Sequence, residues 1–177
     1  RYTDSETLIP TIKNNYKQVI SKETSYQILS MLEGTIKRGT GKRLKDLNVP
    51  LAGKTGTTND NYDAWFIGSS SNLVIGVYIG FDSPKTLGRY ETGAKAALPI
   101  FKEFIKEALY KDDFKAFLIP KEIFFSAINY NTGKIENFSN PNSIVEAFKL
   151  SDINKIKNNN LDNNTNYDSL IKFRQFY

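Results

Sequence analysis

The residues best suited to chemistry lie at positions 53–60, which read Gly-Lys-Thr-Gly-Thr-Thr-Asn-Asp. On an extended strand, side chains two positions apart share a face, so the hydroxyls of Thr55 and Thr57 should point the same way. Lys54 adds positive charge near that face, and Gly56 lets the backbone of a ligand approach closely. Such a strand is suited to lie along an extended peptide or to stabilise a developing oxyanion.

Two other interpretations of this segment compete with a ligand-binding strand. One is a plain polar turn between two strands. The other is a phosphate loop, because residues 52–55 end like a Walker A motif. That motif needs a glycine five residues before Gly53, where Asn48 stands, and Pro50 falls inside the loop. The missing glycine argues against a phosphate cradle, whereas the polar turn stays open on these residues alone.

Composition limits the chemistry that the chain can do by itself. Its 177 residues contain neither cysteine nor histidine, which excludes disulfides, thiol nucleophiles and a Ser-His-Asp triad within the chain. Proton transfer would have to use lysine, tyrosine, a carboxylate or a group on other sequence. The net charge of +5 comes from scattered basic residues, so we expect a solvated surface and no nucleic-acid partner.

The sequence does not begin with methionine, and no apolar run approaches the roughly 20 residues that span a bilayer. We therefore expect the chain to be a piece of a longer protein, with any membrane anchor upstream of Arg1. This origin is an expectation from the sequence alone.

The elements that must position residues 53–60 begin with a helix. Ser21 is a good N-cap, and Gly39 is a natural C-terminal stop. Apolar residues recur between them at helical spacing and predict one buried face. These residues are Ile28, Leu29, Leu32 and Ile36, with Met31 beside them.

Strands should follow that helix. A short segment at residues 47–54 leads into two apolar runs, 64–67 and 73–79, which predict an antiparallel hairpin. The second run is apolar almost throughout, which is typical of a central strand. A second helix follows, and Pro99 limits how far upstream its regular part extends. Its apolar side carries Ala97, Phe101, Phe104, Ile105, Ala108 and Leu109.

The residue pattern of the sequence changes after Pro120. Residues 123–130 and 134–138 flank an Asn-Thr-Gly turn and predict a small hairpin, and residues 144–150 suggest a short helix. About half of residues 154–166 are asparagine, which predicts disorder. We therefore divide the chain into a main α+β part at 1–120, an extension at 121–150 and a disordered Asn-rich tail at 151–177.

Beyond these patterns, residues 51–60 and 63–68 resemble the third motif of class A penicillin-binding proteins. Residues 30–41 resemble the helix and loop before that motif, residues 77–82 the strand after it, and residues 87–101 the last loop and helix. The resemblance covers roughly residues 20–109 and implies a partial serine β-lactamase/DD-transpeptidase-like fold, with an antiparallel sheet packed against helices.

In that family, catalysis uses Ser-x-x-Lys, Ser-x-Asn and Lys-Thr-Gly motifs in chain order. The resemblance assigns Lys54 to the electrostatics and proton transfer of the site, and the hydroxyls of Thr55 and Thr57 to the substrate carboxylate. It gives the Thr57 backbone N–H half of an oxyanion hole, and it places Gly56 and Thr58 beside the substrate.

Two short matches to the other motifs stand in the wrong order, because both follow the Lys-Thr-Gly segment. Residues 169–172 fit Ser-x-x-Lys, and residues 70–72 fit Ser-x-Asn. We expect neither to be functional, and we expect the nucleophilic serine to lie upstream of Arg1.

The resemblance implies a peptidoglycan DD-transpeptidase that acts on D-Ala-D-Ala stem peptides and is acylated by β-lactam antibiotics. It implies no metal and no organic cofactor, and it implies a location at the outer, periplasmic face of the bacterial cytoplasmic membrane. A DD-carboxypeptidase or β-lactamase-like hydrolase, and a non-catalytic ligand-binding module of the same fold, are the alternatives. This piece alone is expected to be inactive.

Overall fold

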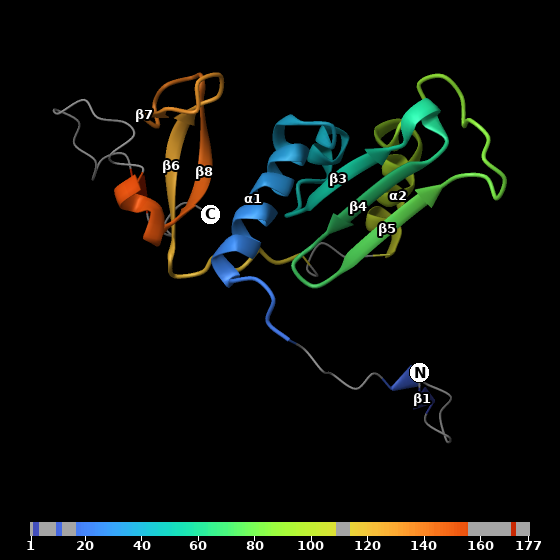
Figure 1. The fold of residues 1–177 in the computed structure, drawn as a ribbon, viewed down its shortest axis with the longest axis horizontal. Coiled ribbons are helices and arrows are strands. Elements are labelled where there is room, and N and C mark those ends of the chain that lie inside the picture. Colours follow the sequence, from blue (N-terminus) through green and yellow to red (C-terminus); the bar gives the residue numbers. More distant parts are fainter. Residues whose placement is uncertain (1, 4–9, 12–16, 109–113, 156–170, 173–177) are drawn as a thin grey trace.

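In the computed structural model, residues 2–3, 10–11, 17–108, 114–155 and 171–172 are described. Helix α1 (Lys22–Arg38) lies between two antiparallel sheets, and it contacts β3 of the first and β8 of the second (Figure 1). The mixed helix and antiparallel-sheet architecture predicted from the sequence is confirmed. Near the start of the chain, β1 (Tyr2–Thr3) pairs with β2 (Pro10–Thr11).

Helix α1 begins and ends where the capping residues predict. The Ser21 hydroxyl accepts a hydrogen bond from the Thr24 backbone N–H at 3.2 Å, and the Gly39 N–H donates to the Thr35 carbonyl at 3.0 Å. The predicted apolar face is only partly correct, because Ile28 and Met31 are 52% and 54% exposed. The helix packs against β3 and β8, and these two residues remain on its exposed surface.

The first sheet contains β3 (Ala52–Thr57), β4 (Ala64–Ser69) and β5 (Val74–Ile79) in the antiparallel order β3-β4-β5. A 3-10 helix, η1 (Lys42–Leu47), precedes β3, so the strand begins later than residue 47. Within the described residues β4 is the central strand and β5 is an edge strand, which corrects the predicted order. Alternate β5 residues are exposed, Val74 by 71%, so this strand is not buried on both faces as its apolar run suggested.

One face of this sheet carries the core. Phe66 of β4 is fully buried, and its ring meets that of Phe101 in an edge arrangement with centroids 4.8 Å apart. Phe101 belongs to α2 (Leu98–Ala108), which follows the π-helical turn η3 (Gly93–Ala97). The regular α-helix begins at Leu98, as Pro99 predicts. Phe104 was assigned to the buried side but is 44% exposed.

The second sheet is formed by β6 (Ile123–Asn129), β7 (Ile135–Glu136), β8 (Ser143–Lys149) and β9 (Ile171–Lys172). Strand β6 pairs with all three others, and the predicted hairpin is confirmed by the β6–β7 pairing. The short helix predicted at 144–150 is wrong, because residues 143–149 pair with β6 along their whole length. Pairing with a neighbouring strand overrides a weak local preference here.

The chain after β8 continues as a 3-10 turn, η5 (Leu150–Asp152), and β9 pairs with β6, so these residues depart from the predicted disorder of the tail. Residues 156–170 and 173–177, which hold most of the predicted disordered stretch, lie outside the described residues. No helix in the described part of the chain is both long and apolar enough to cross a bilayer.

Candidate functional site

The predicted site residues 54–57 lie on β3, and Thr58 follows it. One edge of β3 pairs with β4, and the site is at the other edge. Lys54 is exposed and belongs to the sheet face opposite Thr55, because neighbouring strand residues alternate. Its side chain nevertheless turns to the strand edge, where Nζ donates to the Thr55 carbonyl oxygen at 2.9 Å and lies 3.4 Å from Thr55 Oγ1. The ammonium and the hydroxyl of these two residues therefore meet at the edge.

Thr55 and Thr57 share one sheet face, as their spacing predicts. They lie directly opposite Phe66 and Ala64 of β4, which point to the same side. Thr55 Oγ1 lies 3.1 Å from the hydroxyl oxygen of Thr40, and Thr57 Oγ1 accepts a hydrogen bond from the Gly93 backbone N–H at 3.0 Å. Each hydroxyl is thus contacted by a group from another element.

The backbone groups of β3 alternate between β4 and the open edge. The Thr58 N–H donates to the Asp63 carbonyl at 3.1 Å, which makes this pair a hydrogen-bonded one across the two strands. Because such pairs alternate in antiparallel sheets, Gly56 is turned to β4 and the Thr57 N–H is turned away from it. The same alternation turns the Gly53 and Thr55 carbonyls outward, where the first accepts from the Thr35 hydroxyl of α1 and the second from the Lys54 ammonium.

Helix α1 covers only the beginning of the outer edge of β3, near Gly53. The Thr35 hydroxyl donates to the Gly53 carbonyl, and the Thr35 carbonyl accepts from the N–H groups of Gly39 and Gly41 at 3.0 Å each. The turn after α1 is thereby fixed against β3, with Thr40 at its tip beside Thr55. An anion at this edge would find one ammonium and three hydroxyls within a short stretch.

The far end of β3 is closed by a tight turn. The Thr58 hydroxyl accepts from the Asp63 N–H at 2.7 Å, so this predicted substrate-binding side chain is engaged in the turn. Within the turn, Asp60 and Asn61 have φ angles of 58° and 54°, a left-handed conformation that short polar side chains tolerate best. These bonds hold the strand end at Thr57 in a defined place.

A second loop braces this turn. The Leu87 N–H donates to the Asn61 carbonyl at 2.8 Å, and the Asn61 side-chain amide donates to the Gly88 carbonyl at 3.2 Å. Tyr90 in this loop has a φ angle of 79°, which is an outlier for a bulky residue. The loop leads directly to Gly93, so the strain lies just before the residue that contacts Thr57.

The sheet face that carries Lys54 also carries exposed aromatic side chains. The rings of Trp65 and Tyr78 lie 4.6 Å apart, and the Tyr78 hydroxyl donates to Asp63 Oδ1 at 2.9 Å. That hydrogen bond raises the pKa of Tyr78 above its ordinary value. These groups form a polar and aromatic surface on that face of the sheet.

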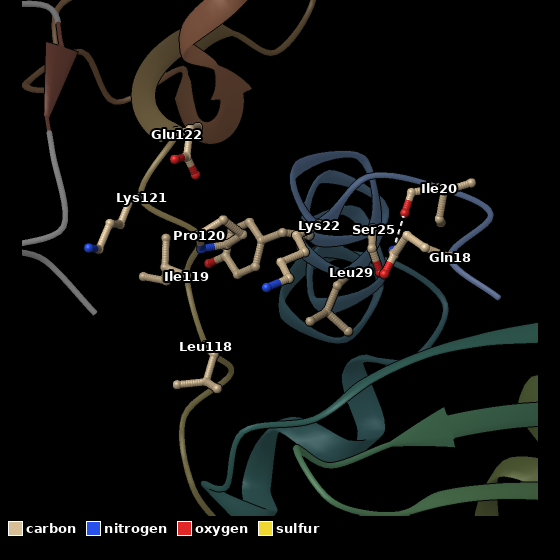
Figure 2. A pocket seen from close by; sticks show the side chains of 11 residues that line it. Gln18, Ile20, Lys22, Ser25, Leu29, Leu118, Ile119, Pro120, Lys121 and Glu122 are labelled. Carbon is tan, nitrogen blue, oxygen red and sulfur yellow. Dashed lines mark hydrogen bonds between the residues drawn. The ribbon is translucent and has the colours of Figure 1, made fainter. Parts of the chain in front are cut away.

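Of the two out-of-order motif matches, the one at residues 70–72 is not brought to this edge. Ser70 is buried, and its hydroxyl donates to Asn72 Oδ1 at 2.7 Å within the β4–β5 turn, where it shapes the hairpin. Ser169 lies outside the described residues. A hollow of ≈ 690 Å³ between the start of α1 and residues 118–122 also lacks every predicted site residue (Figure 2).

Thr40 and Gly93 are the contacts that sequence reasoning did not assign to the site. Both lie in segments with the family resemblance, Thr40 between two glycines and Gly93 after Glu91-Thr92. Their contacts with Thr55 and Thr57 join residues 15 and 36 positions apart, so no local pattern reveals them.

Comparisons with known proteins give a consistent result. Residues 8–106 match the family model described as the penicillin binding protein transpeptidase domain. Penicillin-binding protein 1A of Rickettsia conorii is 39% identical over 168 residues, which are 92% of this chain and 21% of that protein. Penicillin-binding protein 1A of Pseudomonas aeruginosa is 42% identical over 137 residues, or 77% of this chain and 17% of that protein.

Among solved structures, the crystal structure of penicillin-binding protein 1A from Haemophilus influenzae matches with a TM-score of 0.64 and 34% identity. The match covers 74% of this chain and 21% of that one. The chain thus spans about a fifth of the length of these relatives.

Proposed function

Because this chain belongs to the family of penicillin-binding protein transpeptidase domains, we propose that the open edge of β3 is one wall of a peptidoglycan DD-transpeptidase active site. The observation that carries this proposal is the meeting of the Lys54 ammonium with the Thr55 hydroxyl, 3.4 Å apart, at that edge. An ammonium beside a row of hydroxyls suits the terminal carboxylate of a D-Ala-D-Ala stem peptide, and equally that of a β-lactam.

The proposed roles follow from where each group points. Thr55 and Thr57 donate their hydroxyl protons to the substrate carboxylate, and Lys54 supplies the positive potential that makes binding an anion favourable. The Thr57 N–H, turned away from β4, stabilises the oxyanion of the tetrahedral intermediate. Gly56 leaves room for the substrate backbone, and Thr58 acts by closing the turn that holds Thr57.

The proposed reaction is acyl transfer through a serine. The serine oxygen attacks the penultimate carbonyl carbon, its proton passes to a base of the site, and the terminal D-alanine leaves with a protonated amine. The amine of a second stem peptide then attacks the acyl-enzyme ester and releases the serine. Lys54 assists these proton transfers, and no metal or organic cofactor takes part in the proposal.

We place the nucleophile and the Ser-x-Asn motif on sequence upstream of Arg1, together with a membrane anchor. The working site would then lie at the outer face of the bacterial cytoplasmic membrane, where stem peptides are cross-linked. β-Lactams are the expected inhibitors because they present a carboxylate and an acylating carbonyl to the same edge.

The proposal is tested by intact-mass measurement after incubation with benzylpenicillin. The full-length protein is expected to gain one penicilloyl group, and the 177-residue chain alone is expected to gain none. An adduct on the isolated chain would refute the placement of the nucleophile. No adduct on the full-length protein would refute the transpeptidase assignment and favour a non-catalytic module.

A second assay separates transfer from hydrolysis. With a D-Ala-D-Ala stem peptide and an excess of acceptor amine, the full-length protein is expected to form cross-linked peptide and free D-alanine. Release of D-alanine without cross-links would identify a carboxypeptidase, in which water is the acceptor.

A further inference from the structure

The two hydroxyls that β3 presents are both contacted by groups from flanking elements. The Thr57 oxygen accepts from the Gly93 N–H at 3.0 Å, and the Thr55 oxygen lies 3.1 Å from Thr40 Oγ1. Lys54 Nζ approaches the same Thr55 oxygen to 3.4 Å. Gly93 lies at the start of η3 and Thr40 in the turn after α1, so the support comes from two sides of the strand.

A threonine hydroxyl has a single proton and an oxygen that accepts. When its oxygen accepts from a fixed donor, the proton is left to be donated to another group. This is the situation of Thr57, because a backbone N–H can only donate. Lys54 likewise only donates, so the Thr55 oxygen is favoured as an acceptor in its contact with the ammonium.

The direction of the Thr40–Thr55 bond then depends on what occupies the edge. A bound carboxylate accepts the Thr55 proton, and the Thr40 hydroxyl must in turn donate to the Thr55 oxygen. A chain of hydroxyls that all donate toward an anion strengthens each bond in it.

We infer that Thr40 is a positioning residue, which orients the Thr55 hydroxyl as a donor to the substrate carboxylate. This inference rests on the proposed function and adds to it a residue outside the Lys-Thr-Gly segment. Thr40 acts through Thr55 and does not itself contact the reacting carbonyl.

The turn that carries Thr40 is built to hold it in place. A side chain at Gly39 would meet the Thr35 backbone at 3.0 Å, and one at Gly41 would meet Ile36 Cγ1 at 3.2 Å, so both flanking glycines pack closely against α1. Thr35 bonds to this turn through its carbonyl and to β3 through its hydroxyl. One residue of α1 therefore sets the position of Thr40 relative to Thr55.

The test compares Thr40→Val and Thr40→Ser in the full-length protein. Valine keeps the shape of the side chain without its hydroxyl, and serine keeps the hydroxyl. The acylation rate is measured against the concentration of benzylpenicillin. The half-saturating concentration is expected to rise about five- to tenfold for Thr40→Val, the loss of one hydrogen bond, with the limiting rate unchanged. Thr40→Ser is expected to remain within about twofold of the parent.

Two further measurements separate this role from a structural one. Benzylpenicillin methyl ester lacks the carboxylate, so Thr40→Val is expected to react with the ester as the parent does. In a Thr55→Val background, Thr40→Val is expected to add no further loss, because its effect passes through Thr55.

Equal acylation of Thr40→Val and the parent by benzylpenicillin would overturn the inference and leave the proposed function standing. An equal loss toward the acid and the ester would also overturn it, since that result indicates a general disturbance of the site. If the parent itself is not acylated, the proposed function fails and this inference fails with it.

Discussion

Gly93 lies where β3 and β4 leave no room for a side chain, so Gly93→Ala is a sharp perturbation of the proposed site. A methyl group there would come within 2.5 Å of the Gly56 carbonyl oxygen and closer still to that of Trp65. Both obstacles are backbone atoms of paired strands, which cannot rotate away. The start of η3 must therefore move outward from the sheet.

The size of that movement sets the expected effect. Side-chain Cβ atoms do not approach other atoms within 3.0 Å, and the nearer obstacle, the Trp65 carbonyl oxygen, therefore requires η3 to retreat by about 0.8 Å. The Gly93–Thr57 hydrogen bond then lengthens from 3.0 Å to about 3.8 Å, where it is lost. Its loss costs about 1 kcal/mol and the overpacking about 1–3 kcal/mol, and the better helix propensity of alanine offsets up to about 1 kcal/mol.

We therefore expect a net loss near 2 kcal/mol, or a melting temperature lower by about 4–8 °C. Thermal unfolding followed by circular dichroism measures this change. In the full-length protein, penicillin acylation is expected to fall about tenfold or more, because the Thr57 hydroxyl loses its fixed orientation.

Gly76→Ala is the matched control. A methyl group at this strand position meets nothing nearer than Ile67 Cγ1 at 4.0 Å, so the change is expected to be neutral or slightly stabilising. If Gly93→Ala melts and labels like the parent, the close approach of η3 to the sheet does not hold the site in the way described.

Three more predictions follow from other groups. Lys54→Ala is expected to slow penicillin acylation of the full-length protein about 10²-fold or more, with a melting temperature close to that of the parent because the side chain is exposed. Burial raises the pKa of Glu33 above its ordinary value of 4.5, and the ammonium of Lys37, 3.8 Å away, cancels only part of this rise. Because the folded state then holds the proton more tightly than the unfolded state, the free energy of unfolding falls as the pH rises above 4.5. Glu33→Gln should therefore melt above the parent at about pH 7 but not at about pH 4. Arg38→Ala leaves the half-buried carboxylate of Glu146 without its ion-pair partner and should cost about 1–2 kcal/mol in urea unfolding.

The controls are a carboxylate whose pKa is lowered and an ion pair that is exposed. A hydrogen bond from Ser21 lowers the pKa of Glu23, so Glu23→Gln should lose stability at neutral pH and match the parent in acid. A melting difference for Glu33→Gln that is the same at both pH values would contradict the assigned cause. Lys106→Ala breaks an exposed pair with Glu103 and should change stability by no more than about 1 kcal/mol. If Arg38→Ala costs no more than this control, the ion pair to Glu146 does not stabilise the fold.

Local signals in the sequence were sufficient for the elements around the site. Ser21 and Gly39 marked the ends of α1, and the two-residue spacing of Thr55 and Thr57 placed both hydroxyls on one face. The physical cause is that caps and strand alternation depend on neighbours within a few residues. The resemblance around Lys54 then pointed to the correct family, which the comparisons confirm.

The features that the sequence predicted wrongly or did not reveal depend on residues far apart in the chain. Ile144 and Phe148 have helical spacing, yet pairing with β6 makes this segment a strand. The apolar run of β5 indicated a central strand, but its place at the edge depends on which strands are present beside it. The supports of Thr55 and Thr57 come from Thr40 and Gly93, which only the folded chain brings near.

The position of α1 between two sheets affects how this protein can be shortened for study. The family match ends at residue 106, yet the far flank of α1 is held by strands beyond that point: Gln27 donates to the Ala147 carbonyl at 3.1 Å, and Lys149 Nζ donates to Thr24 Oγ1 at 2.7 Å. A version trimmed at the family boundary would strip one side of the helix that is followed by the turn carrying Thr40. A minimal form intended for inhibitor screening should therefore retain the chain through Leu150.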